Sequence, residues 1–258
     1  MRRVLVIVPV PLDSEGVGNR QGQLQEAELG PGIEFHYRPV KAGCALFDSY
    51  HDWLLADLAV FEAGLGAEEE GYDAVCVDTI SDSGVNPLRS VLDIPVIGPG
   101  RASYLMALML GERFSVLTQW DGWTGLYGKR LQELGLADRL ASVRSIDMLP
   151  DLHDLLGGKE DVVFPRLLEE GRGCVEDGAD VVCLGSTTMH QAGPFLAENL
   201  PVPVINPGPL TYKLAETMLA LGLTHSRRTY RRPDAPKPEM VRAMLAAAAD
   251  FEQSRAGA

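Results

Sequence analysis

Apolar residues follow two different periods along most of the chain. Short apolar runs that are typical of buried strands occur at VLVIV (4–8), DAVCVDT (73–79), IPVIG (94–98), FSVLT (114–118) and VVCL (181–184). Between these runs apolar residues recur at helical spacing, as at Leu54, Leu58, Phe61 and Leu65. Strands that alternate with helices form βαβ units, so the pattern predicts an α/β fold with mainly parallel sheets.

Two blocks of sequence recur in the second half of the chain. GYDAVCVDT (71–79) matches GADVVCLGS (178–186), and the segment 94–110 matches 202–218 at nearly the same offset. Two separate blocks repeated at one spacing indicate two similar structural units. We therefore predict two pseudo-symmetric halves, each a three-layer αβα unit.

The predicted domain boundaries follow from these halves. The first α/β domain comprises 1–98 and 208–225, and the second comprises 99–207. Residues 226–258 are predicted to form a basic, Pro-rich arm and a C-terminal helix. Each half has a strand that ends in a polar loop, and parallel sheets bind ligands at the carboxyl ends of their strands. The candidate site is therefore expected in the cleft between the two domains.

Charge and composition narrow the class of protein. The formal net charge of −13, from 36 acidic against 23 basic residues, argues against a nucleic-acid binder. The N-terminal apolar run is too short to cross a bilayer, so no membrane association is predicted. The four cysteines show neither a C-x-x-C pair nor Cys/His metal spacing, which predicts a reduced, cytoplasmic protein without a metal. No nucleotide-binding glycine pattern occurs, so no cofactor is predicted.

The loop and strand motifs together resemble a known family. TISDSGV (79–85), IPVIG (94–98), FSVLT (114–118), VCLGSTTM (182–189) and VPVIN (202–206) are similar to motifs of the aspartate/glutamate/hydantoin racemase superfamily, closest to its hydantoin and allantoin racemase branch. The resemblance covers roughly residues 4–223. It implies a homo-oligomer with a small-molecule substrate. It also implies one cysteine at the strand end of each half, the two thiols moving a proton at opposite faces of the substrate.

This sequence departs from the resemblance at both cysteine positions. Thr79 and Ser186 stand where the two thiols are expected. An alcohol is a far weaker acid than a thiol and needs an adjacent base even to act as a nucleophile. Cys76 and Cys183 lie three residues earlier, on the opposite face of each strand, where core packing is expected. The two-thiol mechanism is therefore not expected.

Polar residues near the two loops are the candidates for the chemistry. We expect Thr79 and Ser186 to work with a base, either His190 or Asp82. Two alternatives stay open, a solvent-facing His190 and an Asp82 that caps a turn. The predicted substrate contacts are Ser81, Ser83, Thr118, Trp120, Tyr127, Thr187 and Thr188.

Two functions are compatible with these features. The first is an enzyme that acts on a small carboxylate, imide or cyclic amide by isomerase, lyase or hydrolase chemistry in a cleft that stabilises an enolate or oxyanion. The alternative is a non-catalytic protein that binds a small anion and has lost both thiols. The basic segment 226–238 can clamp a neighbouring subunit, close over an anionic substrate, or serve as a solvated linker.

Overall fold

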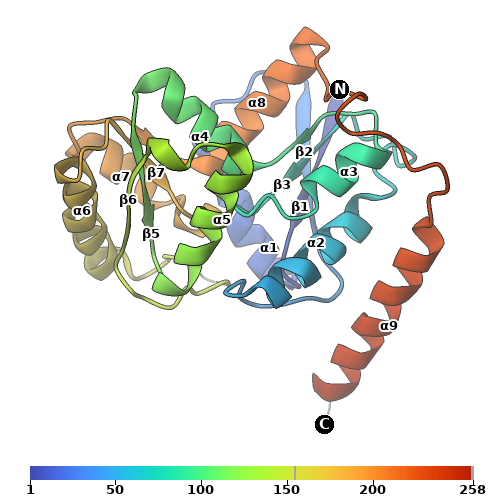
Figure 1. Cartoon of the computed structure of the whole chain (residues 1–258). Coiled ribbons are helices and arrows are strands. Elements are labelled where there is room, and N and C mark those ends of the chain that lie inside the picture. Colours follow the sequence, from blue (N-terminus) through green and yellow to red (C-terminus); the bar gives the residue numbers. More distant parts are fainter. Residues whose placement is uncertain (154, 257–258) are drawn as a thin grey trace.

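Two four-stranded parallel sheets form the framework of the computed structural model (Figure 1), which describes residues 1–153 and 155–256. The first sheet has the order β2-β1-β3-β4, with β1 (Arg2–Val8), β2 (Ile33–Pro39), β3 (Ala74–Val77) and β4 (Val96–Ile97). The second has the order β6-β5-β7-β8, with β5 (Phe114–Thr118), β6 (Leu140–Ser145), β7 (Val181–Leu184) and β8 (Val204–Ile205). The matching orders confirm the prediction of two similar α/β halves with parallel sheets.

Helices cover the faces of both sheets. Those of the first half are α1 (Ser14–Gln21), the 3-10 turn η1 (Gly22–Glu26), α2 (Tyr50–Gly64) and α3 (Val85–Val91). The second half contains η2 (Asp121–Trp123), α5 (Thr124–Leu134), η3 (Ala137–Arg139), α6 (Glu160–Glu176), η4 (Thr187–Met189) and α7 (Ala192–Asn199). Two further helices, α4 (Pro99–Leu110) and α8 (Pro207–Leu221), cross between the halves, and α9 (Pro238–Ala256) ends the chain.

The crossing helices correspond to the repeated Pro-Gly segments of the sequence. Each has Pro at its first position, where the fixed φ of proline suits a helix start. Helix α4 follows the first sheet but packs against β5 and β7 of the second, while α8 follows the second sheet and packs against β3 and β4. The two helices also contact each other. This exchange joins the halves and holds the ends of β3 and β7 at a common cleft.

The central strands supply the core of each half. Residues Val4–Val8 of β1 are fully buried, because a central parallel strand has helices on both faces. Cys76 and Cys183 are also fully buried, and burial raises the pKa of both thiols far above the usual range. The prediction that these two cysteines belong to the core is confirmed.

The basic segment packs against the first half of its own chain. The hydroxyl of Tyr230 accepts hydrogen bonds from Arg89 Nη1 at 2.9 Å and Arg101 Nη1 at 3.0 Å. Arg227 forms an ion pair with Asp93, and helix α9 packs against α2. This segment therefore packs against the first half, and its Thr229 and Tyr230 line the same hollow as Ser81 and Asp82.

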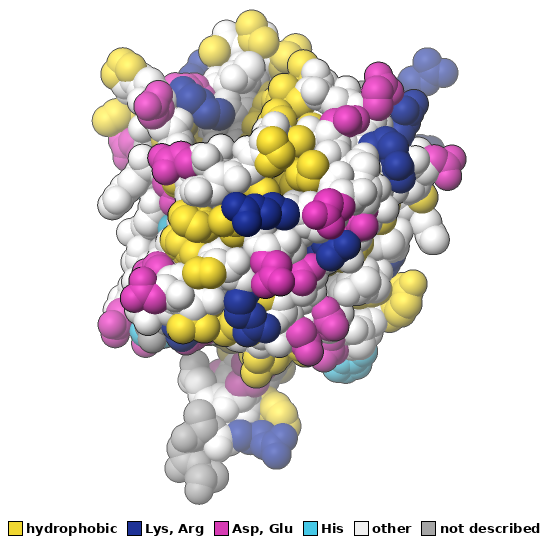
Figure 2. All heavy atoms as spheres, turned by 90° about the vertical axis from the view of Figure 1, so that its left-hand side faces the viewer, with side chains coloured by type: hydrophobic (Ala, Val, Ile, Leu, Met, Phe, Trp, Pro, Cys, Tyr) yellow, Lys and Arg dark blue, Asp and Glu magenta, His cyan; other side chains and the backbone are white. Residues whose placement is uncertain are grey.

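Charges of both signs are interspersed on the face that carries α6 (Figure 2). Arg144 there pairs with Glu170 at 3.1 Å and with Asp177 at 2.7 Å, so a basic side chain is offset by two acidic ones. An extended basic surface of the kind that binds a phosphate backbone is absent from this face. Among the described residues, no helix is both long and apolar enough to cross a membrane.

Candidate active site

The loops that follow β3 and β7 meet at one cavity. Its walls come from both halves: Pro9, Val10, Arg20, Ala45, Leu46, Phe47, Asp78, Thr79, Ile80, Trp123, Leu126, Leu152, Gly185, Ser186, Thr187 and Thr188. Thr79 and Ser186 therefore line the same space, although 107 residues separate them in the chain (186 − 79). The cavity measures about 40 Å³, room for little more than one or two water molecules.

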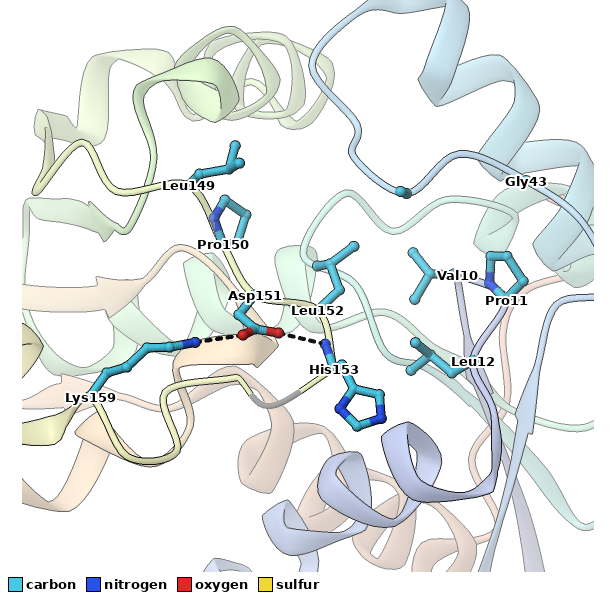
Figure 3. A pocket seen from close by; sticks show the side chains of 11 residues that line it. Val10, Pro11, Leu12, Gly43, Leu149, Pro150, Asp151, Leu152, His153 and Lys159 are labelled. Atoms are coloured by element: carbon cyan, nitrogen blue, oxygen red, sulfur yellow. Dashed lines mark hydrogen bonds and ion pairs between the residues drawn. The ribbon is translucent and has the colours of Figure 1, made fainter. Parts of the chain in front are cut away.

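A wider hollow of about 620 Å³ adjoins this cavity and shares Val10, Ala45 and Leu152 with it. Figure 3 shows the segment Leu149–His153 of the second half facing Val10–Leu12 and Gly43 of the first. Asp151 accepts hydrogen bonds there from Lys159 Nζ at 2.5 Å and from the His153 N–H at 3.0 Å. The hollow is large enough for a small organic molecule, and it adjoins the inner cavity at these three shared residues.

Hydroxyl groups follow each strand end. Thr79 Oγ1 lies 3.0 Å from Ser81 Oγ, which lies 2.8 Å from Ser83 Oγ. Ser81 and Ser83 lead away from the cavity, and Ser81 lines a separate hollow instead. The two predicted contacts are therefore not brought to the cavity wall, because the loop leaves the cavity after Ile80.

The second loop is ordered by its own side chains. Ser186 Oγ caps the short turn η4, because it accepts a hydrogen bond from the Thr188 N–H at 3.1 Å. The same oxygen lies 2.8 Å from Thr188 Oγ1. Within residues 1–153 and 155–256, the N–H groups of Thr79, Ile80 and Ser186 donate no hydrogen bond. Both strand ends thus offer hydroxyls together with available N–H donors.

A buried ion pair, which the sequence analysis did not single out, joins the two loops. Arg20 of α1 is 2% exposed, and its Nη1 lies 3.2 Å from both Asp78 Oδ2 and Thr187 Oγ1. Gln23 Nε2 donates to Asp78 Oδ1 at 3.1 Å, and Thr187 Oγ1 donates to the Asp78 carbonyl at 3.2 Å. Arg20 Nε has no acceptor among the described atoms. No motif marks Arg20, because only the packing of α1 brings it between the two loops.

Asp82 lies away from the cavity. Its carboxylate accepts the N–H groups of Gly100 at 2.7 Å and Arg101 at 2.9 Å, and Arg130 Nη2 lies 2.6 Å away. These donors are the first turn of α4 and a buried guanidinium of α5. The carboxylate therefore caps α4 and pairs with Arg130, instead of capping the turn in which Asp82 itself lies.

His190 lies neither in the cavity wall nor at the surface. Its side chain is 4% exposed, so the alternative of a solvent-facing histidine is wrong. Its Nδ1 lies 2.7 Å from Glu26 Oε1, and Asn206 Nδ2 donates to Glu26 Oε2 at 2.7 Å. The residue therefore belongs to a buried polar cluster behind the second loop.

The aromatic wall comes from different residues than predicted. Tyr127 and Thr118 are fully buried behind the cavity, where the Tyr127 hydroxyl lies 2.6 Å from Thr118 Oγ1 and donates to the Gly185 carbonyl at 2.8 Å. Trp120 stands outside and packs edge-on against Trp123. Trp123 lines the cavity in its place, because the turn η2 brings this second tryptophan inward.

Comparison with known proteins agrees with this architecture. The Asp/Glu/Hydantoin racemase family matches residues 21–215. The chain belongs to this family. The resemblance seen in the sequence motifs is therefore confirmed.

Individual relatives extend the match over most of the chain. The hydantoin racemase of Pseudomonas sp. (strain NS671) is 34% identical over 208 residues, covering 79% of this chain and 81% of the relative. The structure of allantoin racemase from Klebsiella pneumoniae superposes with a TM-score of 0.82 and 27% identity, covering 92% of this chain and 95% of that one. Arylmalonate decarboxylase, at 19% identity and a TM-score of 0.57 over 88% of this chain and 96% of its own, shares the fold.

Proposed function

We propose that this chain is an enzyme that forms an enolate or a related oxyanion from a small carboxylate, imide or cyclic amide between Thr79 and Ser186. The observation that carries this proposal is the meeting of two repeat-related loops at one cavity, each with hydroxyl and N–H donors. Donors held in place before the reaction stabilise developing negative charge without reorganising. Relatives named hydantoin and allantoin racemases make ring amides the first substrates to test.

The surroundings of the donors favour this chemistry. Phe47, Trp123 and Leu126 form an apolar wall that excludes water, and exclusion of water strengthens hydrogen bonds to an oxyanion. Arg20 adds a positive charge beside both loops. The same apolar wall favours a substrate with a ring or alkyl group next to its reacting carbon.

The reaction also needs a group that accepts a proton from carbon. In the described part of the chain, no thiol lines the cavity, and Asp78 is its one carboxylate. We assign the role of proton acceptor to Asp78 in place of His190 and Asp82, because Arg20 and Gln23 orient the Asp78 carboxylate at the cavity. Thr79 and Ser186 are assigned the role of hydrogen-bond donors to the substrate oxygen on which negative charge develops.

Exchange of the substrate's carbon-bound proton for deuterium tests this proposal. Hydantoins with benzyl or alkyl groups at C5, allantoin and small dicarboxylates are incubated with the protein in D₂O, and loss of the C–H signal is followed by NMR. We expect exchange with at least one of them, and Ser186→Ala and Thr79→Val should slow it by about 10–10³-fold. Ser90→Ala is the matched control, because this partly exposed hydroxyl donates to its own helix backbone.

One feature also supports the alternative of a non-catalytic anion-binding protein. The carboxylate of Asp78 is already paired with Arg20, and no thiol assists it within the described residues. Calorimetric binding of the same compounds without any exchange of deuterium would establish this alternative. Neither binding nor exchange would overturn both functions.

A further inference from the structure

The segment 40–49, which connects β2 to α2, forms one wall of the cavity and carries a thiol. Ala45, Leu46 and Phe47 line the cavity, and Gly43 lines the outer hollow. Cys44 lies in the middle of this segment and is partly exposed, whereas the other three cysteines are buried. Cys44 packs at the edge of a core cluster, and the proposed reaction does not use its thiol.

An imidazole and a carboxylate lie beside the Cys44 thiol. Cys44 Sγ is 3.3 Å from Asp52 Oδ1, and His51 Nδ1 is 2.9 Å from the same oxygen. One donor atom from each of these residues lies within 4.8 Å of the other two. Thiolate, imidazole and carboxylate are the donors that Zn²⁺ prefers, whereas Mg²⁺ and Ca²⁺ prefer oxygen alone.

The capping interaction at the start of α2 uses only one of the two carboxylate oxygens of Asp52. Ser49 caps α2: its hydroxyl donates to Asp52 Oδ2 at 2.6 Å and accepts the Asp52 N–H at 3.3 Å. This arrangement uses Oδ2 and leaves Oδ1 directed at the thiol and the imidazole. The cap therefore holds one carboxylate oxygen in position for a further ligand.

The charge around these donors is negative. The Asp48 carboxyl interacts with that of Asp52, and Glu252 of α9 accepts the Gly43 N–H at 3.3 Å. In residues 1–153 and 155–256, no Lys or Arg forms an ion pair with Asp48 or Asp52. Asp52 is paired with His51, and the further carboxylates around this pair favour the binding of a metal cation.

We propose that Cys44 Sγ, His51 Nδ1 and Asp52 Oδ1 bind one Zn²⁺ ion. Tetrahedral ligands at zinc bond lengths of about 2.0–2.3 Å lie roughly 3.3–3.6 Å apart. The observed separations from Asp52 Oδ1, 2.9 Å to His51 Nδ1 and 3.3 Å to Cys44 Sγ, come within about half an ångström of those values. The donor atoms of Cys44 and His51 lie within 4.8 Å of each other. Water or Asp48 completes the fourth position, and the Cys44 thiol releases its proton to solvent on binding.

The position of this site gives it a consequence for the cavity. Zinc would tie the middle of the segment 40–49 to the first turn of α2. The cavity wall formed by Ala45, Leu46 and Phe47 would then be held in one position, next to the outer hollow. The metal would have a structural role at this wall and would take no part in the reaction.

Titration of the metal-free full chain with Co²⁺ and then Zn²⁺ tests the proposal without any activity assay. A thiolate ligand gives Co²⁺ a near-ultraviolet charge-transfer band, which Zn²⁺ should abolish at one equivalent per chain. Loss of an outer-shell partner alone weakens a metal site by about 10–100-fold. Cys44→Ser and His51→Ala should therefore each weaken zinc binding by at least about tenfold. His36→Ala, which removes a histidine paired with Glu34, is the matched control.

Hydrogen exchange gives a second, independent readout. Zinc should slow amide exchange in the segment 40–49 of the native protein and leave the Cys44→Ser protein unchanged. Absence of the charge-transfer band would overturn the proposal. Equal zinc affinity in the native and Cys44→Ser proteins would also overturn it, because the metal would then bind elsewhere on an acidic surface. Neither outcome depends on whether the cavity catalyses a reaction.

Discussion

Replacement of Asp82 by alanine separates a structural role for this carboxylate from a catalytic one. The Asp82 side chain is 0% exposed and that of Arg130 is 8% exposed. Asp82→Ala removes the acceptor for two guanidinium nitrogens, Nη2 at 2.6 Å and Nε at 3.1 Å, and for the first N–H groups of α4. Among the residues that the structure describes, the buried cation of the variant keeps one partner, Glu133 at 2.8 Å.

The size of the effect follows from burial. Removing one partner of a buried ion pair costs about 3–5 kcal/mol, because the remaining charge stays desolvated. We expect Asp82→Ala to lower the free energy of unfolding by about that amount. Arg130→Met in the same protein should restore part of the loss, because it removes the unpaired cation. The coupling between the two changes should reach about 0.5–3 kcal/mol.

Urea denaturation followed by circular dichroism measures these free energies. Asp138→Ala, which removes an exposed aspartate of the second half, is the control and should change stability by less than about 0.5 kcal/mol. An Asp82→Ala protein as stable as the native one, yet inactive in deuterium exchange, would refute this reasoning. Asp82 would then be a base, and its contacts with α4 and Arg130 would be incidental.

Three further predictions concern the site and His225, the residue that precedes the basic segment. Gly185→Ala should slow deuterium exchange of the substrate and lower the free energy of unfolding by about 1–3 kcal/mol, because the added methyl carbon would lie 2.6 Å from the Tyr127 hydroxyl. Gly125→Ala is the control, because in the described part of the chain its added methyl carbon would have no atom within 4 Å beyond its chain neighbours and the backbone of its own helix. Trp123→Ala should raise KM for hydantoins with ring substituents by about tenfold and leave that for unsubstituted ones unchanged. Burial and the nearby charge of Arg227 lower the pKa of His225 in the folded protein. The neutral imidazole therefore contributes fully to stability above its unfolded-state pKa of about 6.5, and this contribution is lost as the pH falls through the lower folded-state pKa. His225→Asn should therefore lose less thermal stability than the native protein between about pH 7.5 and pH 5; equal losses would contradict the prediction.

Local sequence pattern predicted the parts of the fold that depend on local chemistry. Strand β3 and its repeat β7 are fully buried apolar runs, and burial between helices requires such runs. The repeat also predicted that Thr79 and Ser186 lie at equivalent strand ends, and both line the same cavity. Periodicity carries this information because it records which face of an element is buried.

The roles of residues a few positions beyond the strand ends were not readable in this way. Asp82 has a φ of +54° and turns toward α4, and His190 turns toward Glu26 behind the second loop. One change of direction in a loop moves a side chain from one wall to another, and loop paths depend on distant contacts. Residues that lie close to the strand ends in the sequence, such as Asp82 and His190, therefore do not all lie at the cavity.

The sequence by itself determined the α/β class, the duplicated halves, the family and the absence of a thiol at each strand end. Only the tertiary structure placed Arg20 between the two loops, chose Trp123 over Trp120 for the cavity wall, and set Cys44 beside His51 and Asp52. The physical reason is that hydrophobic periodicity is a local property of the chain. A site is a set of distances between segments, and those distances exist only once the halves, the crossing helices and the loops have packed together.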